Sequence, residues 1–532
     1  MEAEKDDGNV EYKLKLIGKT SDRIDSLTSQ MKFRMEEGGG ECIYKIGIRD
    51  DGTIEGITQD EYKETLSLIE HIAKINNYGI SSIIEKDVDS LKKIYELLIR
   101  EKNDNTYIDI KVAITGAVDA GKSSLLGLLT TGKLDDGRGS ARSHVFNFKH
   151  EIKSGRTSSL AHHILGFNST GNIVNYNKLG KLSWPDIVSN SSKIISFIDM
   201  AGHEKYLKTT ISGLSSCIPD ICLILVGANM GINNITKEHI FLCLTLKIPF
   251  VIIISKMDIV IDRQNVYQET MDSICNLLKL PGVRRIPYKV KEQDDIVLCA
   301  EKIYHNTFTP IFEISNVTGK GIDKLQLFFN LIGNREKFYD TTKPTEYHID
   351  TVFKNIKGVG IVFGGNLMSG SIKIGDKLVV GPINQEYLPV IIKSIHCKRV
   401  PLSEVNHATY VCVGVKGIDK NIVRKGHVLL SPSHQLNAIL EFEADINIFK
   451  GHSTTIKPLY EPIIHTHNIR QSAILVEIIN KHEKPNDNIL RIGDRALVKL
   501  RFKYHHVYMK VGYRLFLYDG KTKAIGIVTK LL

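Results

Sequence analysis

A glycine-rich segment that ends in lysine and serine is the part of this sequence best suited to do chemistry. It reads Gly116-Ala-Val-Asp-Ala-Gly-Lys-Ser123 and fits the pattern G-x-x-x-x-G-K-[ST]. In this pattern backbone N–H groups enclose phosphate oxygens, and the N-terminus of the following helix adds partial positive charge. Lys122 can then reach the β- and γ-phosphates of a nucleotide, and the Ser123 hydroxyl can bind Mg²⁺. The predicted contacts in this segment are Gly116, Val118, Asp119, Ala120, Gly121, Lys122, Ser123 and Ser124.

The flanking segments have the character that this motif requires. The apolar run 110–115, with Lys111 as its one charge, predicts a strand before the motif. Apolar residues at helical spacing in 124–129 predict a helix after it. Strand, glycine-rich turn and helix is the context in which the motif binds phosphate. The alternative is a glycine-rich turn that binds nothing, and the motifs that follow argue against it.

Two later segments suit the γ-phosphate and a metal ion. Asp199-Met-Ala-Gly202 ends a predicted strand and fits D-x-x-G. We expect Asp199 to hold Mg²⁺ through water and the Gly202 N–H to meet the γ-phosphate. Thr157, between the two motifs, is the expected switch threonine, with its hydroxyl on Mg²⁺ and its N–H on the γ-phosphate. The predicted metal ligands are therefore Ser123, Thr157 and Asp199.

Two segments at the ends of later strands favour guanine as the base. Asp258, in Ser255-Lys-Met-Asp258, can accept two hydrogen bonds from the guanine N1 and N2 groups, which adenine lacks. Lys256 can lie along the base, and a backbone N–H of Ser315-Asn-Val317 can meet guanine O6. An ATP-using P-loop enzyme such as a kinase is the alternative, and Asp258 argues against it. The predicted contacts are Ser255, Lys256, Asp258, Ser315, Asn316 and Val317.

The pattern of elements predicts four domains. Residues 1–109 predict a small α+β domain, and 110–338 alternate strands and helices in a doubly wound, mainly parallel α/β sheet. Its strands are expected at 110–115, 194–199, 221–227, 250–255 and 311–315, with the nucleotide at their carboxyl ends. Short strands punctuated by glycine then predict two β-barrels, 344–432 and 436–532.

Smaller features complete this prediction. In the N-terminal region we expect strands at 12–17 and 42–48, and helices through Leu66–Ala73 and Leu91–Leu98. The insertion 158–193, which holds the only tryptophan, Trp184, is predicted as a loop.

Composition is that of a globular cytoplasmic protein. The chain has 532 residues, 42% hydrophobic and 24% charged, and its apolar runs are of strand length, so no membrane partner is expected. The eight cysteines lack paired spacing and are expected to be reduced core thiols.

Positive charge is concentrated towards the C-terminus. Residues 341–532 hold 27 Lys+Arg against 15 Asp+Glu, a surplus of +12, whereas the whole chain carries +10. This surplus suits a polyanion such as RNA or, equally, an ordinary solvated surface; no DNA partner is expected. The mixed basic and aromatic run 499–506 suits RNA, with a solvated barrel face as the alternative. His465 and His467 suggest a metal pair, against which structural or RNA-facing histidines are favoured.

Beyond these motifs, the sequence resembles the translational GTPases of the elongation factor Tu and elongation factor one-alpha class. Asp199-Met-Ala-Gly-His-Glu-Lys-Tyr206 looks like D-x-[PA]-G-H-x-x-[YF], and Val118-Asp-Ala-Gly-Lys-Ser123 matches V-D-x-G-K-[ST]. The segments 30–37 and 151–159 look closer to the GTP-binding protein one/two branch. The resemblance spans nearly the whole chain.

This resemblance implies an elongation-factor-like enzyme that hydrolyses GTP to GDP and phosphate with Mg²⁺, in which His203 is catalytic and orients the attacking water. It also implies a monovalent cation near Asp119 and a tRNA or ribosome as partner in translation. The alternative is a GTP-switched regulatory module for mRNA decay or ribosome surveillance, in which turnover is incidental.

Two residues depart from the family pattern. Ser255 replaces the asparagine of N-K-x-D, which removes an amide contact to the base and the P-loop and is expected to weaken nucleotide affinity. Arg156 replaces the apolar residue that precedes the switch threonine and helps to gate the catalytic histidine in elongation factor Tu. It is also the one obvious candidate for an arginine finger in the sequence.

The role of Asp258 gives a test of base choice. Asp258→Asn should shift preference from guanine towards xanthine nucleotides, because the amide presents a donor to xanthine O2. Competition of GDP, XDP and ADP for the site in parent and variant measures this. Equal affinity of the parent protein for ATP and GTP would contradict a guanine site.

Overall fold

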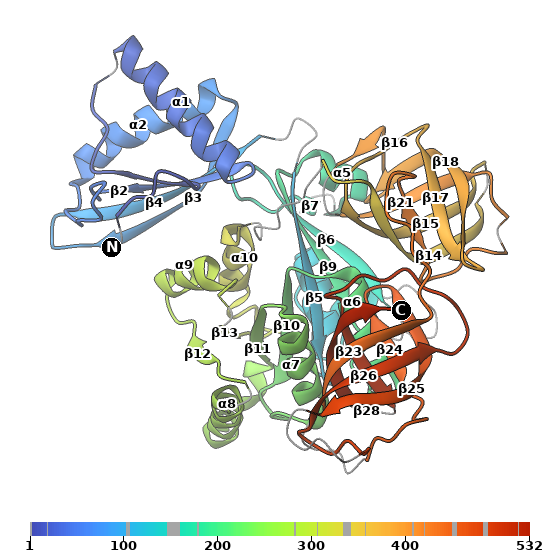
Figure 1. Cartoon of the computed structure of the whole chain (residues 1–532). Coiled ribbons are helices and arrows are strands. Elements are labelled where there is room, and N and C mark those ends of the chain that lie inside the picture. The colour runs from blue at the N-terminus through green and yellow to red at the C-terminus, as the bar shows by residue number, and fades with distance from the viewer. Residues whose placement is uncertain are drawn as a thin grey trace. The chain divides into compact units, whose positions relative to one another are not determined.

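The computed structural model describes residues 3–18, 20–102, 107–145, 160–177, 180–280, 283–305, 307–333, 342–356, 358–406, 409–419, 421–448, 455–481, 488–519 and 521–532. The chain forms two compact units. Figure 1 labels their helices and strands. The first comprises residues 1–204 and 219–336, and the second comprises residues 205–218 and 337–532. The boundary expected near residue 109 therefore falls inside the first unit. No helix in the described ranges is long and apolar enough to cross a membrane.

The chain begins with a four-stranded sheet covered by two helices. The strand order is β1-β2-β4-β3, and the elements are β1 (Val10–Lys13), α1 (Ser21–Glu37), β2 (Glu41–Ile46), α2 (Gln59–Ile75), β3 (Tyr78–Asp87) and β4 (Lys93–Glu101). Thr58 caps α2 in a reciprocal capping box with Glu61, which fixes where this helix starts. Met31 and Ile69 from the helices share a core with Leu97 of the sheet.

The helix predicted through Leu91–Leu98 is wrong, because these residues lead into and form β4. Tyr95, Leu97 and Ile99 alternate along the strand and are buried in the core beneath the helices. Leu98 faces the other side, where it lines a cavity together with Val297 and Ala300 of the helix 293–302. Both faces of β4 are covered, so its apolar residues occupy neighbouring positions and imitate helical spacing.

The next sheet has seven strands in the order β12-β13-β11-β10-β5-β9-β6. It confirms the doubly wound, mainly parallel sheet and the five strands predicted for it. Only β6, at one edge, runs antiparallel to its neighbour β9. The strands are β5 (Ile108–Gly116), β6 (Ala161–Phe167), β9 (Lys193–Asp199), β10 (Ile221–Gly227), β11 (Phe250–Ser255), β12 (Ile286–Lys289) and β13 (Phe308–Glu313). The helices are α3 (Lys122–Thr131), α5 (Trp184–Ser189), α7 (Asn234–Leu246), α8 (Gln264–Lys279), α9 (Gln293–Lys302) and α10 (Ile322–Leu331).

The insertion predicted as a loop contains regular structure. It forms β6, the short pair β7 (Tyr176–Asn177) and β8 (Gly180–Lys181), and α5, which Ser183 caps. Leu165 and Phe167 of β6 join the core of the large sheet. The prediction failed because these apolar residues are few and depend on pairing with β9, a contact that local spacing does not reveal.

The second unit contains two six-stranded barrels, which confirms the predicted architecture. In the first, β17–β18 pairing closes β14 (Glu346–Ile356), β15 (Gly360–Ser369), β17 (Lys377–Ile383), β18 (Glu386–Cys397), β21 (Tyr410–Lys416) and β22 (Val428–Leu430). Short β16 (Ile372–Lys373), β19 (Val400–Leu402) and β20 (Glu404–Val405) flank it. The second contains β23 (Glu441–Ile448), β24 (Ile463–Thr466), β25 (Ile469–Lys481), β26 (Arg495–Phe502), β27 (Arg514–Asp519) and β28 (Lys521–Leu531).

One helix from the middle of the chain belongs to this second unit. α6 (Leu207–Cys217) begins four residues after His203 and groups with the barrels. The Asn366 amide of β15 donates to the Ser216 carbonyl at 2.7 Å, and the Lys208 ammonium lies 5.5 Å from the centre of the Tyr518 ring. The segment after D-x-x-G-H is therefore attached to the barrels.

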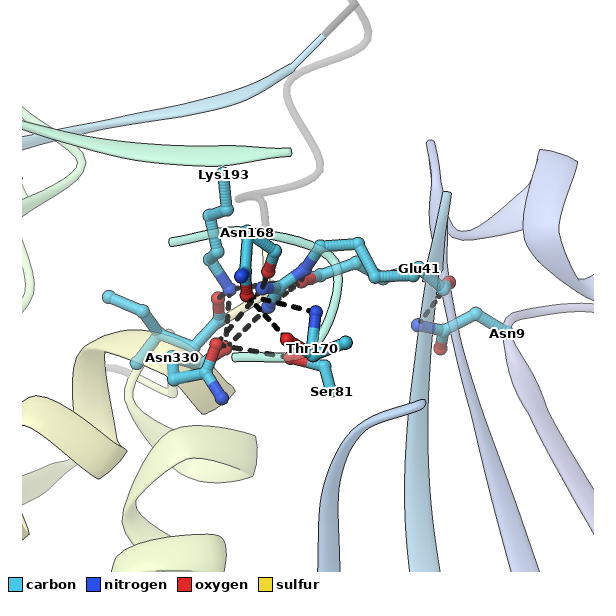
Figure 2. Close-up of polar contacts among 9 residues, drawn as sticks. Asn9, Glu41, Ser81, Asn168, Thr170, Lys193 and Asn330 are labelled. Atoms are coloured by element: carbon cyan, nitrogen blue, oxygen red, sulfur yellow. Dashed lines mark hydrogen bonds and ion pairs between the residues drawn. The ribbon is translucent and has the colours of Figure 1, made fainter. Parts of the chain in front are cut away.

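A buried polar cluster joins the N-terminal sheet to the P-loop sheet (Figure 2). Glu41 of β2 accepts hydrogen bonds from Arg100 of β4 at 2.7 Å and from Lys193 of β9 at 3.2 Å. Arg100 and Lys193 also donate to the Asn330 carbonyl of α10, at 2.9 and 2.8 Å. Arg100 and Lys193 are fully buried, so the one carboxylate of Glu41 balances two buried cations.

This cluster predicts that Glu41 stabilises the first unit. Glu41→Gln should cost roughly 3–5 kcal/mol, because two buried cations lose their carboxylate. Glu85→Gln, whose partner Lys93 is exposed, is the matched control and should cost less than about 1 kcal/mol. Hydrogen exchange of the full-length chain, read over β2, β4 and β9, measures both. Equal protection in the Glu41→Gln variant and the parent would show that the cluster contributes nothing to docking.

Candidate nucleotide-binding site

The predicted motifs gather at the carboxyl edge of the P-loop sheet. Gly116 ends β5, Asp199 ends β9 and Ser255 ends β11, while Ser315 follows β13. A cavity of about 230 Å³ opens beside them. Its lining includes Val118, Asp119, Gly121, Lys122, Ser123, Ser124, Gly202, His203 and Lys256. The parallel strands thus bring together residues that are more than 100 positions apart in the chain.

The turn before α3 depends on backbone conformations that few side chains tolerate. Gly121 has φ +84°, and Asp119 is left-handed with φ +61°. A Cβ atom on Gly116 would lie 2.4 Å from the Leu225 carbonyl oxygen of β10. The turn therefore packs directly on the neighbouring strand, with its backbone exposed towards the cavity.

Lys122 is held beneath this turn in a buried position. Its ammonium donates to the carbonyl oxygens of Gly116 at 3.0 Å and Ala117 at 2.7 Å. Burial lowers the pKa of Lys122 to about 8, while the nearby carboxylates of Asp199 and Asp119 act in the opposite direction. A phosphate anion in the cavity would stabilise the charged ammonium.

Gly202 passes next to this lysine. A Cβ atom there would lie 2.2 Å from Lys122 Nζ and 2.6 Å from the Gly116 carbonyl oxygen. The glycine of D-x-x-G is therefore required for space, and it lines the same cavity as Lys122. His203, the next residue, lines the same cavity.

The metal prediction fits the oxygen atoms present. The Ser123 hydroxyl donates to Asp199 Oδ2 at 3.3 Å, which places two of the predicted ligands together. Hydroxyl and carboxylate oxygens are the ligands that Mg²⁺ prefers, usually with several waters retained. Thr157, the third predicted ligand, and Arg156 lie outside the described residues.

On the base side, Asp258 and Ser315 form one unit. The Ser315 hydroxyl donates to Asp258 Oδ1 at 2.5 Å, and it accepts from the N–H groups of Val317 at 3.2 Å and Thr318 at 3.1 Å. Lys256 adopts a left-handed conformation with φ +61°, and it lines the cavity. The Asp258 carboxylate is thereby oriented by the loop after β13.

Two arginines in the cavity wall were missed by sequence reasoning. Arg138 and Arg142 line the same cavity as Lys122, and both come from the segment after α3. Asp136 Oδ1 accepts from the Arg138 N–H at 2.9 Å and the Ser140 N–H at 3.1 Å, which fixes the turn. The run Asp135-Asp-Gly137 was a usable signal, because Asp side chains commonly build such turns.

The other candidates do not form a second site. The described residues contain no group of three or more His, Cys, Asp or Glu that could hold a metal ion. The ring centroids of His467 and Tyr513 are 3.9 Å apart, and those of His465 and Tyr518 are 5.9 Å apart. Burial lowers the pKa of both histidines to about 3. Their ring contacts agree with the structural half of the favoured alternative, and an RNA-facing role stays a prediction. All eight cysteines are free thiols, as predicted.

Comparison with known proteins agrees with this geometry. Residues 109–351 match the family described as the elongation factor Tu GTP binding domain. GTP-binding protein 1 of Xenopus laevis is 40% identical over 99% of this chain and 79% of its own length. Human GTP-binding protein 2 is 40% identical over 99% of this chain and 87% of its own length.

Solved structures of lower identity share the fold. Elongation factor SelB of Methanococcus maripaludis, in complex with the GTP analogue GppNHp, has a TM-score of 0.56 at 21% identity, covering 80% of each chain. The Ski7 GTPase-like domain of S. cerevisiae, bound to GTP, has a TM-score of 0.59 at 14% identity, covering 80% of this chain and 98% of that one.

Fold and site together define a GTP-binding protein of the translational GTPase class, with a P-loop domain followed by two β-barrels. Within this class, the identity over nearly its whole length shows which branch it represents. The chain belongs to the family of GTP-binding proteins 1 and 2.

Proposed function

We propose that this protein hydrolyses GTP to GDP and phosphate as an elongation-factor-like enzyme of translation. The observation that carries the proposal is that His203 lines the same cavity as Lys122 and Gly202. These are the groups expected to hold the β- and γ-phosphates, so we expect the histidine ring to reach a water that attacks the γ-phosphate. Asp258 and Ser315 supply the guanine end of the site.

In this mechanism the residues divide the work between metal, charge and water. Ser123, Thr157 and Asp199 would hold Mg²⁺, which neutralises charge on the phosphate oxygens when bound. Lys122 adds positive charge from beneath the turn, and His203 orients the water. Asp119 lines the cavity and is the proposed neighbour of a monovalent cation.

The proposed partner is a tRNA, the ribosome or both. The surplus of +12 charges in residues 341–532 supports binding of a polyanion such as RNA. The run 499–506 contributes less than its composition suggests, since Lys499 is paired with Glu441 and Lys503 with Glu461, both at 2.8 Å. Tyr504 remains 63% exposed and available for stacking on a base. A role in translation would place the protein in the cytoplasm, which is part of the proposal.

A second candidate is a GTP-switched module for mRNA decay or ribosome surveillance, in which turnover is incidental. The observation in favour of this second candidate is the shared fold with the Ski7 GTPase-like domain, which was solved both with GTP and with GDP and phosphate. The two candidates differ in whether ribosomes accelerate hydrolysis.

The role of His203 is tested by single-turnover GTP hydrolysis with and without ribosomes and aminoacyl-tRNA. His203→Ala should leave GTP affinity nearly unchanged, because we expect the ring to act on the attacking water and not to bind GTP in the ground state. It should lower the stimulated rate by roughly 10²-fold or more, the contribution of a positioned general base. Lys122→Ala should instead abolish binding.

His71→Ala, an exposed histidine of α2, is the matched control and should hydrolyse GTP at the parent rate. If His203→Ala keeps the parent rate with ribosomes present, the histidine is not catalytic. If ribosomes and aminoacyl-tRNA fail to stimulate the parent protein, the second candidate function is favoured.

A further inference from the structure

The P-loop is attached to both base-recognition segments by side-chain hydrogen bonds. The Ser255 hydroxyl, at the end of β11, donates to the Ala120 carbonyl at 2.7 Å. The Asn316 amide, in the loop after β13, donates to the Gly121 carbonyl at 3.2 Å. Ala120 and Gly121 are the two residues immediately before Lys122. Both bonds therefore set where the phosphate-binding lysine begins its helix.

Ser255 alone makes only part of the contact that an asparagine would make. Its side chain is fully buried and has one hydroxyl donor, which reaches the P-loop. An asparagine at this position has an amide with two donors and a longer reach, so it could serve the P-loop and a second group at once. Position 255 lacks an amide side chain, but Asn316 provides one from the loop after β13, the strand that pairs with β11.

Asn316 is built into the site from several sides. It is 7% exposed, and its Nδ2 atom lies 3.1 Å from where a Cβ of Gly121 would be. Its own carbonyl accepts from the Asp135 N–H at 2.9 Å, which attaches the segment that carries Arg138 and Arg142. One residue thus connects the P-loop, the guanine loop and the arginine segment.

The amide also has an unused acceptor. Asn316 Oδ1 is buried and has no hydrogen-bond partner among the described residues. An unpaired buried polar atom is unfavourable, and an apolar residue of similar size would avoid it. Its presence next to the nucleotide cavity indicates that the amide is needed for the Gly121 contact, for a group that arrives with the nucleotide, or for both.

We propose that Asn316 is a positioning residue for the guanine nucleotide and takes over the bracing role of the asparagine that Ser255 replaces. The proposal rests on guanine-nucleotide binding at this site but not on the translational role. Weak affinity, expected from Ser255 in isolation, is offset by the bond from Asn316. The P-loop is thereby fixed to the base-recognition segments by two residues, Ser255 at the end of β11 and Asn316 in the loop after β13.

The test is the dissociation rate of a fluorescent GDP analogue from full-length protein. Asn316→Ala should release GDP about tenfold faster, as expected when one hydrogen bond to the P-loop is lost. Adding Ser255→Asn to this variant should bring the rate to within about threefold of the parent, because the amide returns from the other strand. Ser255→Ala with Asn316→Ala should release GDP faster than either single variant.

Asn265→Ala, an exposed asparagine of α8, is the control and should leave the rate unchanged. Rescue by Ser255→Asn is the decisive readout, since a general loss of stability would not be repaired by an asparagine on a different strand. A parent-like rate in Asn316→Ala, or no rescue by Ser255→Asn, would overturn the proposal. Because the measurement needs no ribosome, a failure of ribosome stimulation would leave this result standing.

Discussion

The burial of the Lys122 ammonium at the carboxyl edge of the P-loop sheet is the constraint on which the nucleotide site depends. The first unit buries two lysines whose pKa values burial lowers to about 8, Lys122 and Lys193. Lys193 lies at the start of β9 and has the Glu41 carboxylate as its partner within the protein. Lys122 lies at the opposite edge and donates to carbonyl oxygens only among the described residues. Lys193 is paired with a carboxylate in the folded chain, whereas the Lys122 ammonium lies beside the cavity, where an anionic ligand would stabilise its charge.

The elements around Lys122 follow from this requirement. Gly202 must lack a side chain because its backbone packs against the ammonium, and His203 follows at once in the cavity wall. Within four residues of His203 the chain enters α6, which groups with the barrels. Gly202, the residue expected to contact the γ-phosphate, is therefore close in sequence to a helix of the other unit. The Ser255 and Asn316 bonds hold the other side of the P-loop.

The sequence was most informative where a residue type has a single physical use. Gly116, Lys122, Asp199 and Asp258 predicted a close backbone approach, a phosphate contact, a metal ligand and a base contact. The structure brings the segments that carry them to one edge of a sheet. It was least informative where tertiary contacts decide. β4 is covered on both faces and imitated a helix, and β6 depends on pairing with β9. Ser255 suggested a weakened site because its partner residue, Asn316, lies 61 positions away and is joined to it only through the P-loop.

Calorimetric titration of GDP at pH 8.5, in buffers of different ionisation enthalpy, tests the role of Lys122 most directly. Burial holds the pKa of the free ammonium near 8, and a bound phosphate raises it. At pH 7 the lysine is mostly protonated, whereas at pH 8.5 most of it is neutral and binding of the anion takes up a proton. We predict net proton uptake at pH 8.5, little at pH 7, and an affinity that falls as the pH rises above about 8. Tight GDP binding without proton uptake at pH 8.5, and with the same affinity at both pH values, would contradict this account.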